Sequence, residues 1–290
     1  MRAWLCQSFG PPESLVLAEA PEPRLGSGSV LVGVRASGLN FPDSLIIEGK
    51  YQFKPAFPFS PGGEVCGVVE AVGDKVTRFR VGERVMGLTG WGGFAERIAA
   101  GEQNLMPAPD GMTDEAAAGF MMTYGTSIHA LRQRGRLEAG QTLLVLGAGG
   151  GVGKAAVEIG KAMGARVIAA ASSDEKLAVA KAAGADELVN YSRDSLRDAL
   201  KTLTRGQGVD VVYDPVGGDL AEQALRSTGW DGRYLVVGFA SGHIPQFAAN
   251  LTLLKGCQIV GVFWGAFAQR EPALNQENFR LLLEWFTAGR

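Results

Sequence analysis

The chain alternates short apolar runs with segments of helical spacing, most clearly in its middle third. Residues 142–146 are almost wholly apolar, which is typical of a strand buried on both faces of a parallel sheet. Five glycines follow within seven residues, and apolar positions then recur at helical spacing over 154–163. A second apolar run covers 166–170. The pattern therefore predicts a strand, a glycine-rich turn, a helix and a second strand.

The same alternation continues toward the end of the chain. Further strands are predicted at 187–191, 209–217, 232–242 and 257–264. Helices are predicted at 174–183, 194–204, 219–227 and 277–288. Strands that alternate with helices imply a parallel, doubly wound sheet, so the fold class is α/β.

The first 110 residues have a different texture. Short β-rich segments at 29–38, 64–74, 84–89 and 94–100 alternate with Gly and Pro turns. Dense turn signals between short strands indicate a mostly antiparallel, partly closed β domain. The chain then becomes helical, with Thr113 as the expected N-cap. A domain boundary is therefore expected between residues 112 and 118.

Composition and charge exclude several classes of protein. Apolar residues make up 46% and charged residues 20% of the 290 residues, which is typical of a globular protein. The net charge is −2 without a basic block, so neither nucleic acid nor an anionic membrane is an expected partner. No apolar run is long enough to span a bilayer, and the N-terminus has no apolar signal core. Three isolated cysteines favour reduced thiols and a cytoplasmic location.

The glycine-rich turn after residue 146 is the main candidate for chemistry. A strict G-x-G-x-x-G pattern fails, because Val152 or Lys154 falls where the last glycine should stand. The spacing that fits is Gly147-x-x-Gly150-x-x-Gly153. Glycine lets the backbone approach a pyrophosphate closely, and the helix N-terminus then offers free N–H groups. A flexible turn that binds nothing is the alternative, but the flanking strands and helix favour a dinucleotide site.

Two other kinds of site are not expected. None of the five tyrosines is followed by a lysine four residues later, so a Tyr-x-x-x-Lys dehydrogenase site is absent. Neither of the two histidines has a cysteine or acid at metal-ligand spacing, so no metal site is expected.

Four stretches carry a resemblance to a known family: "GLNFPDSLIIEGKY", "PFSPGGEVCGVVEAVGDKVTRFRVGERVMGL", "GAGGGVG" and "VVYDPVGG". Together they resemble the zinc-free quinone oxidoreductase (zeta-crystallin-like) branch of the medium-chain dehydrogenase/reductases, over essentially the whole chain. Asn40 and Gly63 stand where zinc-dependent members have cysteine and histidine.

The resemblance also implies a domain organisation. It implies a GroES-like catalytic domain at 1–118 and a Rossmann NADPH-binding domain at 119–260, with the substrate cleft between them. Residues 261–290 would begin a return to the first domain that stops short at Arg290.

The same resemblance implies a reaction. In this branch NADPH gives a hydride to a quinone or to an activated alkene such as an enone, and polar side chains polarise the substrate carbonyl. Asn40 and Tyr51 match the cleft asparagine and tyrosine of the family and are the candidate catalytic residues. Asn40 bonding a turn and Tyr51 lying on the surface are the alternatives. Leu45 departs from members that carry a second tyrosine.

Candidate cofactor contacts also follow from the resemblance. Thr126 matches a threonine beside the nicotinamide, although a helix threonine often bonds only the preceding turn. The turn residues Gly150, Gly151, Val152 and Gly153 would hold the pyrophosphate. Two further segments would lie against the nicotinamide half: Val237, Gly238, Phe239 and Ser241, and Val262, Phe263 and Trp264. The aromatic side chains among them are equally compatible with a core or a dimer interface.

The end of the second strand predicts a preference for NADPH. An NAD site usually carries an acid there, but this chain has alanines at 169–171 followed by Ser172 and Ser173. Lys176 supplies a positive charge, and Tyr191 matches a family tyrosine that closes over the 2′-phosphate. Against this, Asp174 lies nearby and Lys176 could be an ordinary exposed lysine.

The sequence therefore predicts an NADPH-dependent, zinc-independent oxidoreductase that acts on a small-molecule quinone or enone. The resemblance implies a homodimer, paired through the strand at 257–264. One alternative is an enoyl thioester (enoyl-CoA) reductase. The other is a non-catalytic NADPH-binding sensor or an RNA-binding relative, against which the net charge of −2 argues mildly.

Overall fold

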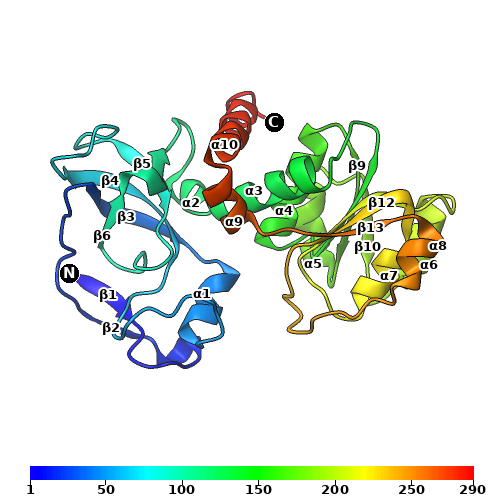
Figure 1. Ribbon diagram of the computed structural model, residues 1–290, viewed down its shortest axis with the longest axis horizontal. Helices are drawn as coiled ribbons and strands as arrows, with labels where there is room; N and C mark the ends of the chain where they lie inside the picture. The colour runs from blue at the N-terminus through cyan, green and yellow to red at the C-terminus, as the bar shows by residue number, and fades with distance from the viewer. The chain divides into compact units, whose positions relative to one another are not determined.

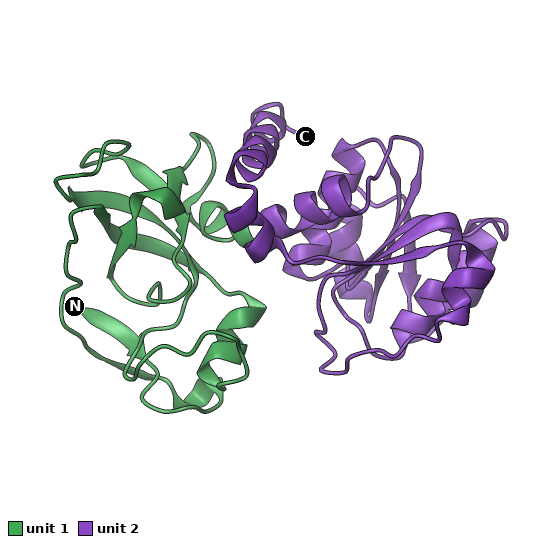
Figure 2. Cartoon of the chain, in the orientation of Figure 1, with its two compact units in different colours: residues 1–122 green, residues 123–290 purple.

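The computed structural model describes all 290 residues and divides them into two compact units (Figure 2). Unit 1 comprises residues 1–122 and unit 2 comprises residues 123–290. The division therefore falls four residues after the end of the first predicted domain, and residues 261–290 lie in unit 2.

Unit 1 is built on a five-stranded antiparallel sheet with the strand order β6-β3-β4-β5-β7 (Figure 1). Its strands are β3 (Ser29–Gly38), β4 (Glu64–Val72), β5 (Arg84–Leu88), β6 (Arg97–Gly101) and β7 (Leu105–Pro107). A separate antiparallel pair joins β1 (Arg2–Leu5) to β2 (Val16–Glu19). In the first half of β3, Val30 and Val32 are fully buried and their neighbours only partly, as a sheet with one core face requires.

Short helices complete unit 1. They are α1 (Phe41–Ile47), α2 (Asp114–Ala118) and the 3₁₀ turns η1 (Pro12–Ser14) and η2 (Glu102–Asn104). The predicted N-cap is confirmed, because the hydroxyl of Thr113 accepts a hydrogen bond of 3.2 Å from the backbone N–H of Ala116. Ile46 and Ile47 of α1 pack with Cys6 and Phe59 in a small second core.

Unit 2 contains a six-stranded parallel sheet with the order β10-β9-β8-β11-β12-β13. The strands are β8 (Thr142–Leu146), β9 (Arg166–Ala171), β10 (Glu187–Asn190), β11 (Val209–Asp214), β12 (Thr228–Val236) and β13 (Gln258–Gly261). The predicted α/β fold class, with a GroES-like β domain and a Rossmann-like parallel sheet, is confirmed. Residues 143–146 of β8 are fully buried, which explains their apolar run.

Helices cover the parallel sheet (Figure 1). α4 (Gly151–Ala162) and α5 (Asp174–Ala182) contact each other and β9, while α6 (Leu196–Leu203) and α7 (Leu220–Arg226) contact each other. Right-handed crossovers put these two pairs on opposite faces, because the chain leaves β8 toward one edge and later leaves β11 toward the other.

The remaining helices were only partly predicted. They are α3 (Met121–Ile128), which continues as the π-helical turn η3 (His129–Arg134), α8 (Asn250–Lys255), α9 (Trp264–Arg270) and α10 (Pro272–Thr287). The strand predicted at 257–264 ends at Gly261, because Trp264 begins a helix. None of the helices combines the length and the apolar character that a membrane crossing requires.

Candidate active site

The carboxyl edge of the parallel sheet in unit 2 collects the segments that follow its strands. β8 and β11 are neighbours, but the chain leads from β8 toward β10 and from β11 toward β13. Ligands of open α/β sheets bind at such a switch point. The glycine-rich turn follows β8 directly and therefore lies at this place.

The structural reason for glycine differs from one position of the turn to the next. Gly147 has φ = +59°, a conformation that disfavours other residues. A Cβ on Gly153 would lie 2.2 Å from the carbonyl oxygen of Gly147, so the turn can close on α4 only with glycine there. At Gly150, the N-cap of α4, a Cβ would meet its nearest atom at 3.4 Å. The fold therefore needs Gly147 and Gly153, whereas Gly150 is free to serve a ligand.

Replacing Gly153 with alanine is expected to lower the free energy of unfolding by about 1–3 kcal/mol, because an added methyl group would overpack a rigid backbone contact. Gly150→Ala is the matched control and should change stability by less than about 1 kcal/mol. Urea unfolding of both variants checks this. Equal stability losses would show that the close contact at Gly153 does not matter.

The residues after β9 form a small polar cluster. The ammonium group of Lys176 donates a hydrogen bond of 3.0 Å to the hydroxyl of Ser172, and Tyr191 lies beside this hydroxyl. The hydroxyl of Ser173 caps α5 by accepting from the backbone N–H of Lys176. A Cβ on Gly149 would lie 2.6 Å from the Cβ of Lys176, so this cluster is packed directly against the glycine turn.

Asp174, the carboxylate nearest to this cluster in sequence, has other partners. Its Oδ1 accepts a hydrogen bond of 2.9 Å from the Asn190 carboxamide, and its Oδ2 lies 3.4 Å from the guanidinium of Arg193. The guanidinium of Arg193 partly neutralises the Asp174 carboxylate, and the Asn190 carboxamide occupies one of its oxygens. The predicted position of Asp174 in the first turn of α5, facing solvent, is confirmed.

The loops after β11 and β12 are joined through Asp214. Its Oδ1 accepts from the backbone N–H groups of Val216 and Gly217 at 2.7 and 2.9 Å, and the hydroxyl of Tyr234 donates to Oδ2. Burial raises the pKa of this carboxyl group above its usual range. The N–H of Ser241 bonds the carbonyl of Val216 at 3.0 Å. The predicted contact segment at 237–241 is therefore held rigidly at the carboxyl edge.

The segment after β13 splits between two environments. The N–H of Val262 bonds the carbonyl of Val236, which keeps Val262 beside that edge, and Phe263 is exposed. The side chain of Trp264 is buried, and its indole N–H donates to Asn275 at 2.9 Å. A Cβ on Gly125 would lie 2.6 Å from the Trp264 ring. Of the two alternatives, a core or a dimer interface, Trp264 therefore occupies the core.

Thr126 lies on α3, which packs against the glycine turn. Its neighbour Ser127, fully buried, donates to the carbonyl of Val152 at 3.0 Å and lies 2.9 Å from the hydroxyl of Tyr213. Sequence reasoning missed Ser127, whose partners are distant in sequence.

In unit 1, the two candidate catalytic residues share the surroundings of Asp43. The backbone N–H of Asn40 donates to Asp43 Oδ2 at 2.8 Å, and its carboxamide Nδ2 donates to Glu64 Oε2 at 2.8 Å. Asp43 Oδ1 also accepts from the backbone N–H of Gly63 at 3.0 Å. Burial raises the pKa of Tyr51, and the charge of Asp43 raises it further. Tyr51 is half-buried and packs against the Ile46–Ile47 core.

Asp43 and Glu64 are buried acids that sequence reasoning did not select. Glu64 stood in the quoted "GGE" stretch, and Asp43 is the third residue of α1. An acid after a Gly-Gly pair was the one available signal for Glu64.

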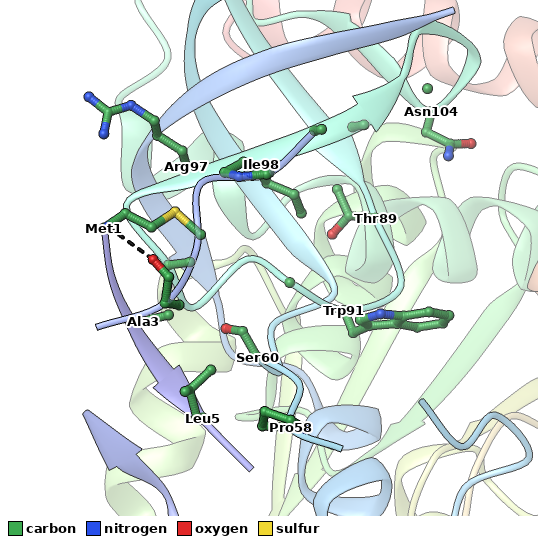
Figure 3. A pocket seen from close by; sticks show the side chains of 17 residues that line it. Met1, Ala3, Leu5, Pro58, Ser60, Thr89, Trp91, Arg97, Ile98 and Asn104 are labelled. Atoms are coloured by element: carbon green, nitrogen blue, oxygen red, sulfur yellow. Dashed lines mark hydrogen bonds between the residues drawn. The ribbon is translucent and has the colours of Figure 1, made fainter. Parts of the chain in front are cut away.

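A pocket of about 440 Å³ lies elsewhere in unit 1 (Figure 3). Its lining includes Ala3, Ser60, Thr89, Trp91 and Ile98, and neither Asn40 nor Tyr51 contributes to it. The lining holds no Asp, Glu, His, Cys, Tyr or Lys side chain that could transfer a proton, so this pocket is not the candidate site.

Comparison with known proteins gives the family. Residues 26–110 match the profile described as "Alcohol dehydrogenase GroES-like domain", and residues 151–287 match "Zinc-binding dehydrogenase". A "Quinone oxidoreductase-like protein 2 homolog" from Nematostella vectensis is 40% identical, covering 100% of this chain and 79% of the relative. One GroES-like unit followed by one Rossmann-like unit defines a medium-chain dehydrogenase/reductase. Within that superfamily, the chain belongs to the quinone oxidoreductase branch.

Solved structures agree. The quinone oxidoreductase from Pseudomonas syringae pv. Tomato DC3000 has a TM-score of 0.91 at 34% identity, covering 99% of this chain and 89% of that one. The quinone oxidoreductase from Thermus thermophilus, whose structure was also solved in complex with NADPH, has a TM-score of 0.84 at 36% identity. That match covers 98% of this chain and 87% of the Thermus chain.

The name of the second profile implies zinc, but the residues of this chain do not fit that metal. The structure brings together no group of three or more His, Cys, Asp or Glu side chains that could hold an ion. Cys66 lies two residues from Glu64, but its thiol is 3.5 Å from an oxygen of Asp114, and burial raises its pKa to about 11.

Proposed function

We propose that the protein is an NADPH-dependent, zinc-independent oxidoreductase that reduces a quinone or an enone. The cluster of Ser172, Lys176 and Tyr191 beside the glycine turn is the observation that carries this proposal. When bound, NADPH supplies the hydride. Everything else in the reaction falls to the side chains and backbone of this chain.

The carboxyl edge of unit 2 suits NADPH in two ways. The first N–H groups of α4 are free for a pyrophosphate, and Gly150 leaves room for its approach. Ser172 and Tyr191 offer hydroxyl donors for a 2′-phosphate, and Lys176 offers a charge. The buried pair of Asp214 and Tyr234 would keep the loops that face the nicotinamide in one conformation.

Asn40 and Tyr51 would stabilise charge on the substrate. The carboxamide of Asn40 keeps one N–H after its bond to Glu64, and that N–H can donate to a carbonyl oxygen that becomes negative. Tyr51 is a neutral donor at pH 7, as tyrosine ordinarily is, and burial raises its pKa further above the usual value of about 10.

These features favour an enzyme over a binding protein. A sensor needs only the cofactor edge, whereas a donor held in place by a buried carboxylate, as Asn40 is, suits a reaction at a substrate carbonyl. An enoyl thioester reductase could use the same donors, and a panel of acceptors separates it from a quinone reductase.

The cofactor assignment can be tested by binding alone. NADPH and NADH are titrated into the wild type, Lys176→Ala and the control Lys181→Ala, which removes an exposed lysine from the same helix. The wild type is expected to bind NADPH more tightly. Lys176→Ala should weaken NADPH by about tenfold or more and leave NADH almost unchanged, because a charge-assisted contact is lost. Equal affinity of the wild type for both cofactors would refute the assignment.

The exposed edge strand β13 supports a homodimer. β13 ends the parallel sheet, and large apolar side chains are exposed on and near it: Trp230, Leu253, Leu254 and Ile259. An open apolar edge of this kind is a site for pairing with another chain. Sedimentation should show a dimer for the wild type and for the control Val179→Lys on α5, but a monomer for Ile259→Lys. A wild-type monomer would contradict the dimer.

A further inference from the structure

Glu64, the first residue of β4, is the most unusual charged group in unit 1. Its side chain is fully buried, and both carboxylate oxygens accept hydrogen bonds. Oε2 accepts from the Asn40 carboxamide at 2.8 Å, and Oε1 accepts from the backbone N–H of Met122 at 3.0 Å. The charged group that acts on it is Asp43, which has the same sign.

A carboxylate in this position is costly for the fold. Burial without a cation disfavours the charged form by several kcal/mol in typical cases, and neutral amide donors repay only a part of this. A glutamine would fill the same volume at a lower cost. The presence of an acid here therefore points to a task that needs two acceptor oxygens on one group.

The task can be read from its partners. A carboxamide can rotate about its terminal bond into two similar positions, and only an outside partner decides where its N–H groups point. While Glu64 is ionised, its Oε2 is an acceptor and cannot donate. It therefore fixes the nitrogen of the Asn40 carboxamide on the side that faces Glu64. Asp43 fixes the backbone of the same residue. The second N–H of Asn40 is then the group left for a ligand.

We propose that Glu64 is a positioning residue, which orients the Asn40 carboxamide so that its remaining N–H donates to the substrate carbonyl. This inference rests on the proposed reductase function. Glu64 does not itself touch the substrate in this role.

The second oxygen of Glu64 extends the role to α3. Met122 lies in the first turn of α3, where backbone N–H groups have no partner within the helix. The carboxylate accepts one of them, which also suits the positive end of the helix dipole. One side chain therefore holds both the Asn40 carboxamide and the start of α3.

The charge state of Glu64 makes the role sensitive to pH. Burial raises the pKa of Glu64 to about 7, and Asp43 on α1 is the charged group that faces it. Protonation places a hydrogen on one of the two oxygens, which makes that oxygen a weaker acceptor for Asn40 or for Met122. The hold of Glu64 on the Asn40 carboxamide should therefore weaken as the pH falls through about 7.

The experiment compares the wild type with Glu64→Gln and with the control Glu70→Gln, which changes a half-exposed acid on the same strand. The first readout is kinetic: kcat as a function of pH, together with the Kd of NADPH. The second is the position of the Asn40 side-chain amide resonances, measured by NMR without cofactor. Glu64→Gln should lower kcat by about 10- to 100-fold, leave the NADPH Kd within about twofold, and remove the limb near pH 7. Glu70→Gln should match the wild type in all of these.

The NMR readout separates this inference from the proposed function. The Asn40 amide resonances should shift with a midpoint near pH 7 in the wild type and stay constant in Glu64→Gln, whether or not any acceptor is reduced. A wild type that oxidises no NADPH sinks the reductase function alone. Asn40 resonances that do not respond to pH in the wild type overturn the inference, as does a Glu64→Gln enzyme with unchanged kcat and pH profile. If Glu64→Gln fails to fold, the wild-type titration still decides.

Discussion

Asn40→Ala is expected to lower kcat for an enone by about 10²- to 10³-fold while NADPH affinity changes little. The variant removes a donor aimed at an oxygen that becomes negative only in the transition state, and loss of one such donor typically has this effect. Tyr51→Phe removes the second proposed donor and should lower kcat in the same direction. Both side chains belong to unit 1 and are absent from the cofactor edge.

The matched control for this series is Asn104→Ala. Asn104 is also an asparagine of unit 1, but it lines the pocket of Figure 3 instead of the network around Asp43. Steady-state kinetics with NADPH and an enone should show wild-type turnover for this control. Wild-type turnover in Asn40→Ala, or a large loss in Asn104→Ala, would contradict the role proposed for Asn40.

The free energy of unfolding of the wild type, relative to that of Glu64→Gln, is expected to fall by about 3 kcal/mol as the pH rises from 4.5 to 7. The pKa of Glu64 rises from 4.5 to about 7 on folding because burial disfavours the charge. A raised pKa means that the folded state takes up a proton in this window. The contribution of Glu64 to stability is therefore fully present below pH 4.5 and is lost as the pH rises through 7.

Urea unfolding of both proteins at several values between pH 4.5 and pH 8 measures this difference. Glutamine cannot titrate, and the other acids are common to both proteins, so the difference reports the titration of Glu64 together with its coupling to Asp43. A difference that stays constant across this range would show that the carboxyl group is not held in an environment that disfavours its charge.

The elements that were predicted best have local causes. β8 and β3 have the predicted bounds: β8 is a continuous apolar run, and β3 begins with buried residues that alternate with less buried ones. α4 begins at Gly151 instead of Lys154, since the glycine turn itself supplies the first turn of the helix. Glycine disfavours helices in general, and only the close contact at Gly153 explains its presence there.

The end of the chain was harder to predict. Val262, Phe263 and Trp264 continue an apolar run, so the pattern favoured a strand. The strand stops because Trp264 turns inward against Gly125, far away in sequence, and forms the beginning of α9. No pattern within residues 257–264 contains that contact.

The residues of the candidate site also differ in whether the sequence could predict them. Residues at the ends of parallel strands, such as Ser172 and Tyr191, could be predicted, because topology brings strand ends to one edge. Glu64 could not, because its partners lie 24 and 58 residues away along the chain. Burial without a cation is a property of the folded chain and leaves no periodicity in the sequence.

The most direct test of the proposed function is to follow NADPH oxidation with a panel of quinones, enones and enoyl-CoA thioesters, with and without EDTA. We expect oxidation with a quinone or an enone, slower oxidation when NADH replaces NADPH, and no effect of EDTA. An enoyl-CoA as the preferred acceptor would redirect the assignment to the thioester reductases. NADPH that binds but is oxidised by no acceptor, or activity that EDTA abolishes, would contradict a zinc-independent NADPH-dependent reductase.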